Sequence, residues 1–398
     1  MPVLNRIAGF GAEMAAWRQD FHRHPELGFA ETRTAGLVAE RLRAFGVDEV
    51  ITGVGRTGVL GVIRGGSNDN QAHGALRAIG LRADMDALPI QEETGLAHAS
   101  TVPGVMHACG HDGHTAMLLG TAKYLAETRN FAGTVYLLFQ PAEETGEGAA
   151  AMLAEGGLLE RFPLDQVFGL HNWPGLPEGH FAWREGPMMA AAARIRVEIR
   201  GRGTHGAAPH LGTDAVLVAA QTICALQGIV ARDLDPLDMG VVSLGDLRCE
   251  GGAWNVLPSR VTLEGTARWL TEEAGRVIEQ RLTEVVRGTA ATAGAVAEVE
   301  FRHVGPPVAN DPGATRLAAE AARLVTGRER VAELPRPTMV AEDFGHLLRA
   351  RPGAFLLLGA GRPGQAQLHQ PSYDFNDALL PIGASWFALL AERLLQRG

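Results

Sequence analysis

The sequence predicts an α/β fold, with a larger domain built on a mostly parallel sheet and a smaller α+β domain inserted into it. Short buried apolar runs alternate with helical stretches in the first and last parts of the chain, which is typical of α/β folds. Between about 188 and 304 the strands instead alternate polar and apolar residues, which indicates a sheet with one face in water. We therefore expect one domain to comprise residues 1–187 and 305–398, and the inserted domain to comprise residues 188–304.

The composition is that of an ordinary globular protein with small-molecule partners. The 398 residues are 46% apolar and 20% charged, long enough for two domains and a large core. A net charge of -9 without a basic run argues against nucleic-acid binding. Three cysteines far apart in the sequence (Cys109, Cys224 and Cys249) fit a reducing compartment better than a disulfide framework. We find no secretory signal and no stretch apolar enough to span a membrane, so we expect a cytoplasmic protein.

The first part of the chain is expected to contain two helices and then two strands. A helix over 8–24 ends at Pro25, and a second over 31–44 ends at Gly46. The strands are predicted over 59–64 and 76–81, with a polar turn over 65–70 between them. We interpret His22 and His24 as structural, because a helix C-terminus favours histidine.

The remaining elements follow the same periodicities. In the larger domain we expect a helix from Thr115, strands over 134–139, 166–170 and 354–358, and a helix over 149–159. In the inserted domain we expect strands over 194–200, 260–268 and 297–303, and helices over 214–232 and 271–290.

One short stretch, residues 106–114, carries a thiol and three imidazoles, which predicts metal binding. Cys109 and His111 are two residues apart, so on an extended segment both side chains would leave the same face. Gly110 and Gly113 let the backbone turn around an ion, and the helix that follows would stabilise a thiolate at its N-terminus. The alternative is a buried cysteine beside solvated histidines, which the spacing makes the weaker interpretation.

Carboxylate pairs follow two of the predicted strands. Asp84 and Asp86 can bind a metal or orient a ligand imidazole, although for Asp84 a turn-forming role fits equally well. Glu143 and Glu144 are adjacent, and their repulsion is explained if one binds a metal while the other moves a proton. A helix N-terminus that favours acids is the alternative for this pair.

Histidines follow two further strands, His171 after 166–170 and His369 after 354–358. In open α/β sheets the ligand crevice lies at the carboxyl ends of the strands. These strand ends with such side chains together predict one converged site, and no single motif is as informative.

These segments together resemble the M20 metallopeptidase family, in particular its amidohydrolase branch of hippurate hydrolases, N-acyl-amino-acid amidohydrolases and auxin-conjugate hydrolases. The resemblance runs nearly end to end. It is carried by His24-Pro25-Glu26, Arg82 to Pro89, Met106 to His114, Phe139 to Gly146, Leu170 to Pro174, Gly201 to His210, Asn255 to Pro258, Glu342-Asp343-Phe344 and His369 to Asp377.

The resemblance implies hydrolysis of the amide bond of N-acyl amino acids at a two-metal site. The implied ligands are Cys109, His111, Glu144, His171 and His369. Glu143 would act as general base and acid. Asp84 and Asp86 keep the role inferred above from their place after a strand, which is to orient the ligand imidazoles. Two divalent ions per subunit are expected, zinc or manganese first, with nickel or cobalt as alternatives.

The resemblance also implies that the inserted domain is a lid that forms a homodimer, or a tetramer. His205 would reach a neighbouring active site and stabilise the oxyanion, while Asn255 and Arg268 would bind the polar end of the substrate. Three alternatives stay open. They are a dipeptidase or aminoacylase-type carboxypeptidase of the same family, a hydrolase with Cys109 as nucleophile, and a non-enzymatic ligand-binding module.

Overall fold

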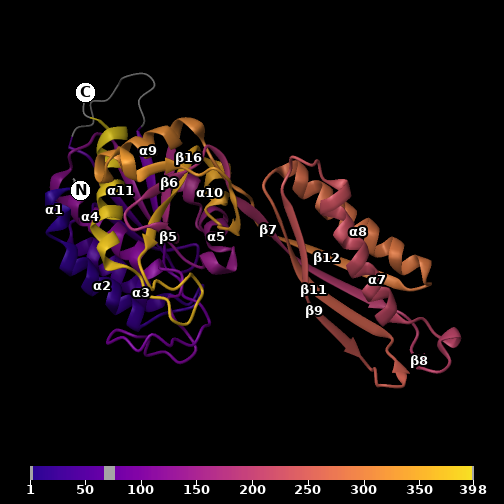
Figure 1. The fold of residues 1–398 in the computed structure, drawn as a ribbon. Coiled ribbons are helices and arrows are strands. Elements are labelled where there is room, and N and C mark those ends of the chain that lie inside the picture. Colours follow the sequence, from indigo (N-terminus) through magenta and orange to yellow (C-terminus); the bar gives the residue numbers. More distant parts are fainter. Residues whose placement is uncertain (1–2, 67–76, 397–398) are drawn as a thin grey trace. The chain divides into compact units, whose positions relative to one another are not determined.

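The computed structural model describes residues 3–66 and 77–396, which divide into two compact units (Figure 1). The first unit comprises Met1–Met188, Val308–Arg336 and Asp343–Gly398, and the second comprises Met189–Pro307 and Pro337–Glu342. The predicted division at 187/188 and 304/305 lies within a few residues of this one. The return of the chain to the second unit at Pro337–Glu342 was not predicted. The predicted turn over 65–70 lies mostly outside the described residues.

The first unit is built on a mixed sheet whose centre is parallel. Its strand order is β1-β2-β4-β3-β5-β16-β6-β14, and β4, β3, β5 and β16 pair in parallel. The pairs β1/β2, β2/β4 and β16/β6 are antiparallel, so the parallel arrangement expected from the sequence holds for the middle of the sheet. The strands are β1 (Glu49–Val54), β2 (Gly58–Arg64), β3 (Ala78–Asp84), β4 (Thr134–Gln140), β5 (Gln166–Pro177), β6 (Phe181–Trp183), β14 (Val331–Glu333) and β16 (Gly353–Gly361).

Helices surround this sheet. They are α1 (Asn5–Ala8), α2 (Gly11–Arg23), α3 (Thr32–Ala44), α4 (His111–Thr128), α5 (Gly148–Ala154), α6 (Leu158–Arg161), α9 (Pro312–Thr326), α10 (Gly345–Ala350) and α11 (Leu380–Leu394). Short 3-10 turns occur at η1 (Glu143–Thr145), η4 (Arg328–Arg330) and η5 (Asp377–Leu379), and a short strand, β13 (Val308–Asn310), precedes α9. Several predicted boundaries are wrong: α4 begins at His111 and not at Thr115, β5 continues through His171 and does not end before it, and the helix expected over 149–159 is divided into α5 and α6.

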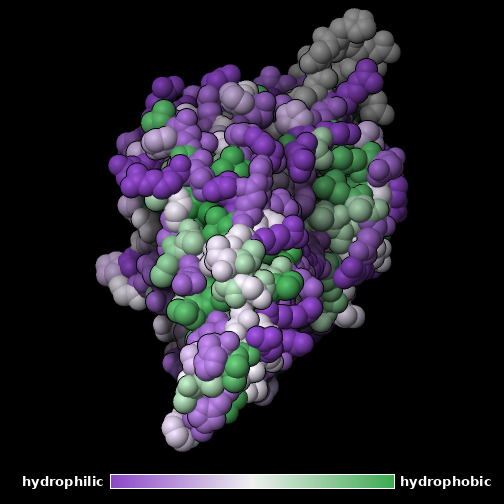
Figure 2. All heavy atoms as spheres, turned by 90° about the vertical axis from the view of Figure 1, so that its right-hand side faces the viewer, coloured by the Kyte–Doolittle hydropathy of each residue, from purple (hydrophilic) through white to green (hydrophobic). Residues whose placement is uncertain are grey.

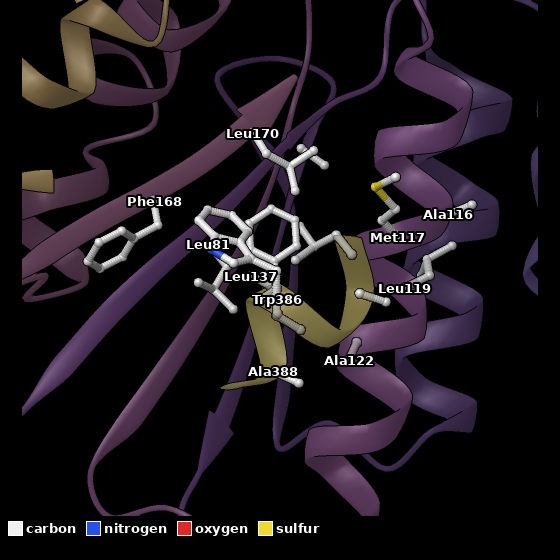
Figure 3. Packing of buried hydrophobic residues seen from close by; sticks show 14 of the residues in the cluster. Leu81, Ala116, Met117, Leu119, Ala122, Leu137, Phe168, Leu170, Trp386 and Ala388 are labelled. Carbon is white, nitrogen blue, oxygen red and sulfur yellow. The ribbon is translucent and has the colours of Figure 1, made fainter. Parts of the chain in front are cut away.

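The core of the first unit lies between the sheet and its helices. Figure 3 shows Trp386 from α11 and Met117 from α4 in one cluster with the strand residues Leu81, Leu137 and Leu170. The strands read as continuous apolar runs because they are buried on both faces, as parallel strands usually are. This packing makes the carboxyl ends of the central strands a rigid base for functional side chains.

The second unit is an antiparallel sheet with two long helices. Its strand order is β12-β7-β11-β9, and β15 adds to β7 in parallel. Its elements are β7 (Gly186–Arg200), β8 (Thr204–His205), η2 (Pro209–Leu211), α7 (Ala215–Gly228), the π-helical η3 (Ile229–Asp233), β9 (Gly240–Glu250), β10 (Val256–Leu257), β11 (Arg260–Trp269), α8 (Glu272–Thr292), β12 (Val296–Gly305) and β15 (Thr338–Ala341). The α+β character expected of the inserted domain is observed, although strand β9 was not predicted.

One helical stretch is more apolar than we expected. Among the described residues, Ala215–Asp233 is long and apolar enough to cross a membrane by length and composition alone, so the expectation that no such stretch exists is wrong. A single helix of this kind is weak support for a membrane protein, because core helices of globular units meet the same criteria. Val218, Ala219 and Leu226 are in fact buried in the core of the second unit, whereas Leu217 is 54% exposed. Figure 2 shows other hydrophobic residues reaching the surface among hydrophilic ones.

Candidate metal centre

The loop before α4 positions Cys109 and His111 by a sharp turn. Gly110 has φ 93°, which is in the left-handed region, and a Cβ atom there would overlap Asn172 Oδ1 and the Tyr373 hydroxyl. The segment is therefore not extended, and our reason for placing Cys109 and His111 on one face was wrong. Cys109 lies just before the helix, whereas His111 is the first residue of α4.

The structure brings together the five residues expected as metal ligands. The Cys109 Sγ atom lies 3.4 Å from His171 Nε2, and His369 Nε2 lies 3.3 Å from Glu144 Oε1. Ligand atoms of Cys109, His111 and His171 lie within 4.8 Å of one another, as do those of Cys109, Glu144 and His369. Two adjoining groups of donors that share Cys109 are an arrangement that can hold two neighbouring ions.

The hydrogen bonds of the imidazoles leave the correct nitrogen atoms free for metal. Nδ1 of His171 lies 2.7 Å from the Asn172 carbonyl oxygen, and Nδ1 of His111 lies 3.0 Å from the Asp86 carbonyl oxygen. Each Nδ1–H can donate to its carbonyl, which leaves Nε2 pointing toward the site, as is usual for metal-bound histidines. Burial is the main cause that lowers the pKa of His171 well below its ordinary value, and the nearby His114 is the second. This ring is therefore neutral.

Several buried atoms of the site need a cation. His111 Nε2 and Glu144 Oε1 have no hydrogen-bond partner within the described part of the chain, although both are shielded from solvent. Burial, together with the carboxylates of Glu144 and Glu143, raises the pKa of the Cys109 thiol well above its ordinary value. The thiolate expected from the helix N-terminus therefore requires an ion beside it. The donor set of sulfur, imidazole and carboxylate fits divalent transition metals.

Asp86 connects two of the ligands. Its Oδ1 lies 3.2 Å from His111 Nδ1, and its Oδ2 accepts the Glu144 N–H at 3.0 Å. One carboxylate therefore orients the His111 imidazole and fixes the backbone of Glu144, which is one of the two roles expected of it from the sequence.

Asp84 lies in a buried charged network and not in a turn. Its Oδ2 accepts from Arg82 Nη1 at 2.7 Å, and its Oδ1 lies 2.6 Å from His114 Nδ1. Burial alone would raise the pKa of Asp84, but His111, Arg82 and His114 lower it well below its ordinary value. The carboxylate therefore stays ionised 3.6 Å from His111 Nε2, and the turn-forming alternative is wrong.

Glu143 lies at the start of η1, beside the ligands. Its Oε2 is 4.0 Å from His111 Nε2, and its Oε1 accepts the Asp343 N–H at 3.3 Å. The side chain is 10% exposed, so it is not completely shielded from solvent. The adjacent Glu144 points toward His369, and the two acids of the pair therefore have different surroundings.

The second unit holds the other three predicted residues. His205 is exposed on β8, and the β8/β10 pairing places it beside Asn255, whose carbonyl oxygen accepts the Gly206 N–H at 2.7 Å. Arg268 is half-buried near the opposite end of β11, where burial lowers the pKa of its guanidinium. The eight residue steps from Arg260 to Arg268 span roughly 26 Å of strand, so Arg268 lies far from His205 and Asn255 of the same chain.

Several buried residues of the site were not predicted. Arg82 is fully buried and donates to Gln140 Oε1 at 2.9 Å and Asp343 Oδ1 at 3.0 Å, as well as to Asp84. His114 Nε2 lies 2.6 Å from Asn172 Oδ1. The three-residue spacing of His111 and His114 at the start of a helix could have indicated that they share a face. No local pattern indicates that Arg82 is buried.

His22 connects the end of α2 to the start of α4. It is fully buried, and its Nδ1 lies 2.8 Å from Asp112 Oδ2, so it fixes the first turn of α4 from the side of α2. His24 is partly exposed and lies 2.9 Å from the Asp20 carbonyl oxygen through Nδ1, as expected of a helix-terminal histidine.

Known proteins similar to this chain share its whole length. The model of peptidase family M20/M25/M40 matches residues 80–393. A hippurate hydrolase of Campylobacter jejuni is 40% identical over 100% of both chains, and an N-acetyl-L-cysteine deacetylase of Bacillus subtilis is 39% identical over 95% of this chain and 87% of its own. A solved Bacillus subtilis structure, described as a dinuclear metal-binding peptidase of the M20 family, superposes with a TM-score of 0.81 at 34% identity and covers 98% of this chain and 99% of its own.

Proposed function

The chain belongs to peptidase family M20/M25/M40, as the resemblance predicted, and we propose that it is a metal-dependent amidohydrolase that cleaves N-acyl amino acids. The products would be a carboxylic acid and a free amino acid. The observation that carries this proposal is the convergence of five donor residues, with the Glu143 carboxylate 4.0 Å from His111 Nε2. The similar hippurate hydrolase and N-acetyl-L-cysteine deacetylase support the same substrate class.

We propose two divalent ions per subunit, zinc or manganese, with nickel or cobalt as alternatives. Cys109, His111 and His171 would hold one ion, and Cys109, Glu144 and His369 the other. Bound ions would polarise the scissile carbonyl and lower the pKa of the attacking water. The similar Bacillus subtilis structure described as dinuclear supports the number of ions, and the mixed donor set supports their type.

Glu143 is the proposed proton carrier. Its Oε2 lies 4.0 Å from His111 Nε2, so it is placed to accept a proton from a water molecule at the metal site. It would then deliver that proton to the leaving nitrogen. The Asp343 N–H, which donates to Oε1 at 3.3 Å, holds the other oxygen in place during both transfers.

We propose a homodimer in which the second copy completes the site. Arg268 lies roughly 26 Å along its strand from the end nearest His205 and Asn255, too far for one small substrate to contact all three in one chain. If His205 and Asn255 come from the partner subunit, while Arg268 comes from the chain that supplies the metal ligands, all three can contact one substrate. The exposed His205 would then stabilise the oxyanion. The β9 edge of the sheet and the exposed apolar residues of α7, Val216 and Leu217, are surfaces that a second copy can cover.

Catalysis by Cys109 as a nucleophile is the weaker alternative. A reactive cysteine needs a lowered pKa, whereas burial and nearby carboxylates raise the pKa of this thiol. The thiol lies 3.4 Å from His171 Nε2, and the pKa of that ring is well below its ordinary value. We also propose a cytoplasmic location, which suits the free, exposed thiols of Cys224 and Cys249.

The test is hydrolysis of a substrate panel by protein loaded with defined metals. We expect amino acid release from hippurate, N-acetyl-Met or related N-acyl amino acids, loss of activity with a chelator, and recovery on metal addition. Glu143→Gln should lower kcat by about two to four powers of ten while two ions per chain remain bound. Activity that resists chelation but is lost on thiol alkylation would favour the cysteine mechanism. Preferred cleavage of dipeptides would favour the dipeptidase or carboxypeptidase alternative, and a folded protein that neither binds metal nor cleaves any substrate would favour a binding module.

A further inference from the structure

The turn that carries Glu143 and Glu144 begins at a residue in an unfavourable conformation. Ala142 has φ 51° and ψ 39°, the left-handed region that residues other than glycine rarely adopt. It is fully buried, so solvent cannot satisfy its backbone. The surroundings must therefore hold this turn in place.

The carboxylate of Glu31 satisfies Ala142. Glu31 is fully buried, and its Oε1 accepts the Ala142 N–H at 2.8 Å. Its Oε2 accepts the Thr57 hydroxyl at 2.6 Å, which fixes the orientation of the carboxylate. The same loop also supports the turn sterically, because a Cβ at Gly28 would lie 3.1 Å from Ala142 Cα.

Glu31 is not needed by its own helix. It occupies the N-cap position of α3, yet its side chain makes no capping hydrogen bond. Glu26 caps that helix instead, since its two oxygens accept the N–H groups of Arg33 at 2.9 Å and Thr34 at 2.8 Å. The loop before α3 thus contains two glutamates with separate partners, one on the helix and one on the turn beside the metal ligands.

We propose that Glu31 is a positioning residue, which aims Glu143 and Glu144 by holding Ala142 in its left-handed conformation. The proposal rests on the proposed function for its catalytic consequence. Asp86 and Asp343 fix the turn further along, through the Glu144 N–H and Glu143 Oε1, but neither contacts Ala142 N–H. Without Glu31 that N–H would be buried without an acceptor, so the turn would relax and move both acids.

The test compares Glu31 variants with a matched control five residues away. Glu31→Ala should lower kcat about 10- to 100-fold with little change in KM, and should weaken metal binding by a similar factor in competition with a chelating dye. Glu31→Gln keeps an oxygen acceptor for Ala142 and should stay within about threefold of the original protein on both measures. Glu26→Ala should lower the melting temperature through loss of the helix cap, with kcat unchanged.

Two further variants keep the test decisive. If Glu31→Ala does not fold, Glu31→Asp can replace it, because aspartate keeps the charge but its shorter side chain moves the carboxylate away from Ala142 N–H. Glu31→Asp should then show the same decreases in kcat and in metal affinity. Ala142→Gly in the Glu31→Asp background should restore part of kcat, because glycine adopts the left-handed region without support. Folded Glu31→Ala or Glu31→Asp protein with unchanged kcat and metal affinity would overturn the proposal. If the original protein cleaves no N-acyl amino acid, the proposed function fails, while the metal titration still decides the role of Glu31.

Discussion

Replacing Arg82 by methionine should destabilise the first unit strongly. Arg82 is fully buried and neutralises Asp84 and Asp343, which are also buried. Removing one partner of a buried ion pair typically costs about 3–5 kcal/mol, because it leaves an uncompensated charge. Asp84 retains His114 at 2.6 Å, so Asp343 bears most of the loss. Asp343 still accepts from Gln140 Nε2 at 2.6 Å and Ala149 N–H at 2.8 Å, which places the expected cost at the lower end, about 3 kcal/mol.

The measurement is the melting temperature of the metal-loaded protein. With an unfolding entropy of about 2.1 cal/mol/K per residue, a loss of about 3 kcal/mol corresponds to a decrease of about 5 °C for a unit of this size. Arg316→Met is the matched control, since the Arg316–Glu185 pair is exposed and its loss should cost no more than about 1 kcal/mol. Adding Asp343→Asn to Arg82→Met should recover part of the decrease, because the stranded charge is removed. A decrease for Arg82→Met no larger than that of the control would refute the reasoning.

Three further predictions concern the metal-binding loop and its support. Gly110→Ala should weaken metal binding at least tenfold in a dye competition, because the new Cβ would overlap Asn172 Oδ1 at a φ of 93°. Cys109→Ser should weaken zinc binding more than manganese binding in the same titration, since a hydroxyl is a harder donor than a thiolate. Burial alone would lower the pKa of His22, but hydrogen bonds to Asp112 and Glu92 raise it from 6.5 to about 9. The protonated ring therefore stabilises the fold fully below pH 6.5, and this contribution is lost as the pH rises through 9. The difference in melting temperature between the original protein and His22→Gln should accordingly be largest below pH 6.5 and shrink toward pH 9, and a difference that is constant with pH would contradict this sign.

The sequence located the carboxylates of the site, Asp84, Glu143 and Glu144, because they lie at the ends of strands that are easy to recognise. Buried parallel strands are continuous apolar runs, and their carboxyl ends must meet at one edge of the sheet. Asp84 and Glu143 were therefore expected near each other without any knowledge of their contacts. The interpretation of Cys109 and His111 reached the correct partners by a wrong local conformation, since the left-handed Gly110 and an early helix start bring them together.

The residues that hold the metal-site side chains in place could not be predicted from strand ends. Glu31 and Arg82 have ordinary neighbours in the sequence, and they act through partners 111 and 261 residues away. A buried charge is visible only when its partners are known, because the pattern of a strand or loop does not distinguish a buried arginine from an exposed one. Strand β9 was missed for a related reason: many of its residues are exposed, so its apolar positions do not stand out.

The buried charges of the site connect the metal ligands to the residues that hold them in place. Asp84, Asp86, Glu143 and Glu144 lie around His111, and Arg82 is the permanent buried cation bonded to this group. Such an excess of buried negative charge is costly unless cations compensate it. The unsatisfied His111 Nε2 and Glu144 Oε1 atoms mark where that compensation is lacking, at the position where the two donor groups meet. Arg82 offsets part of this repulsion by its charge, while the hydrogen bonds from Glu144 N–H to Asp86 and from Ala142 N–H to Glu31 fix the backbone that carries the acids, and this rigid arrangement makes the site attractive to divalent ions.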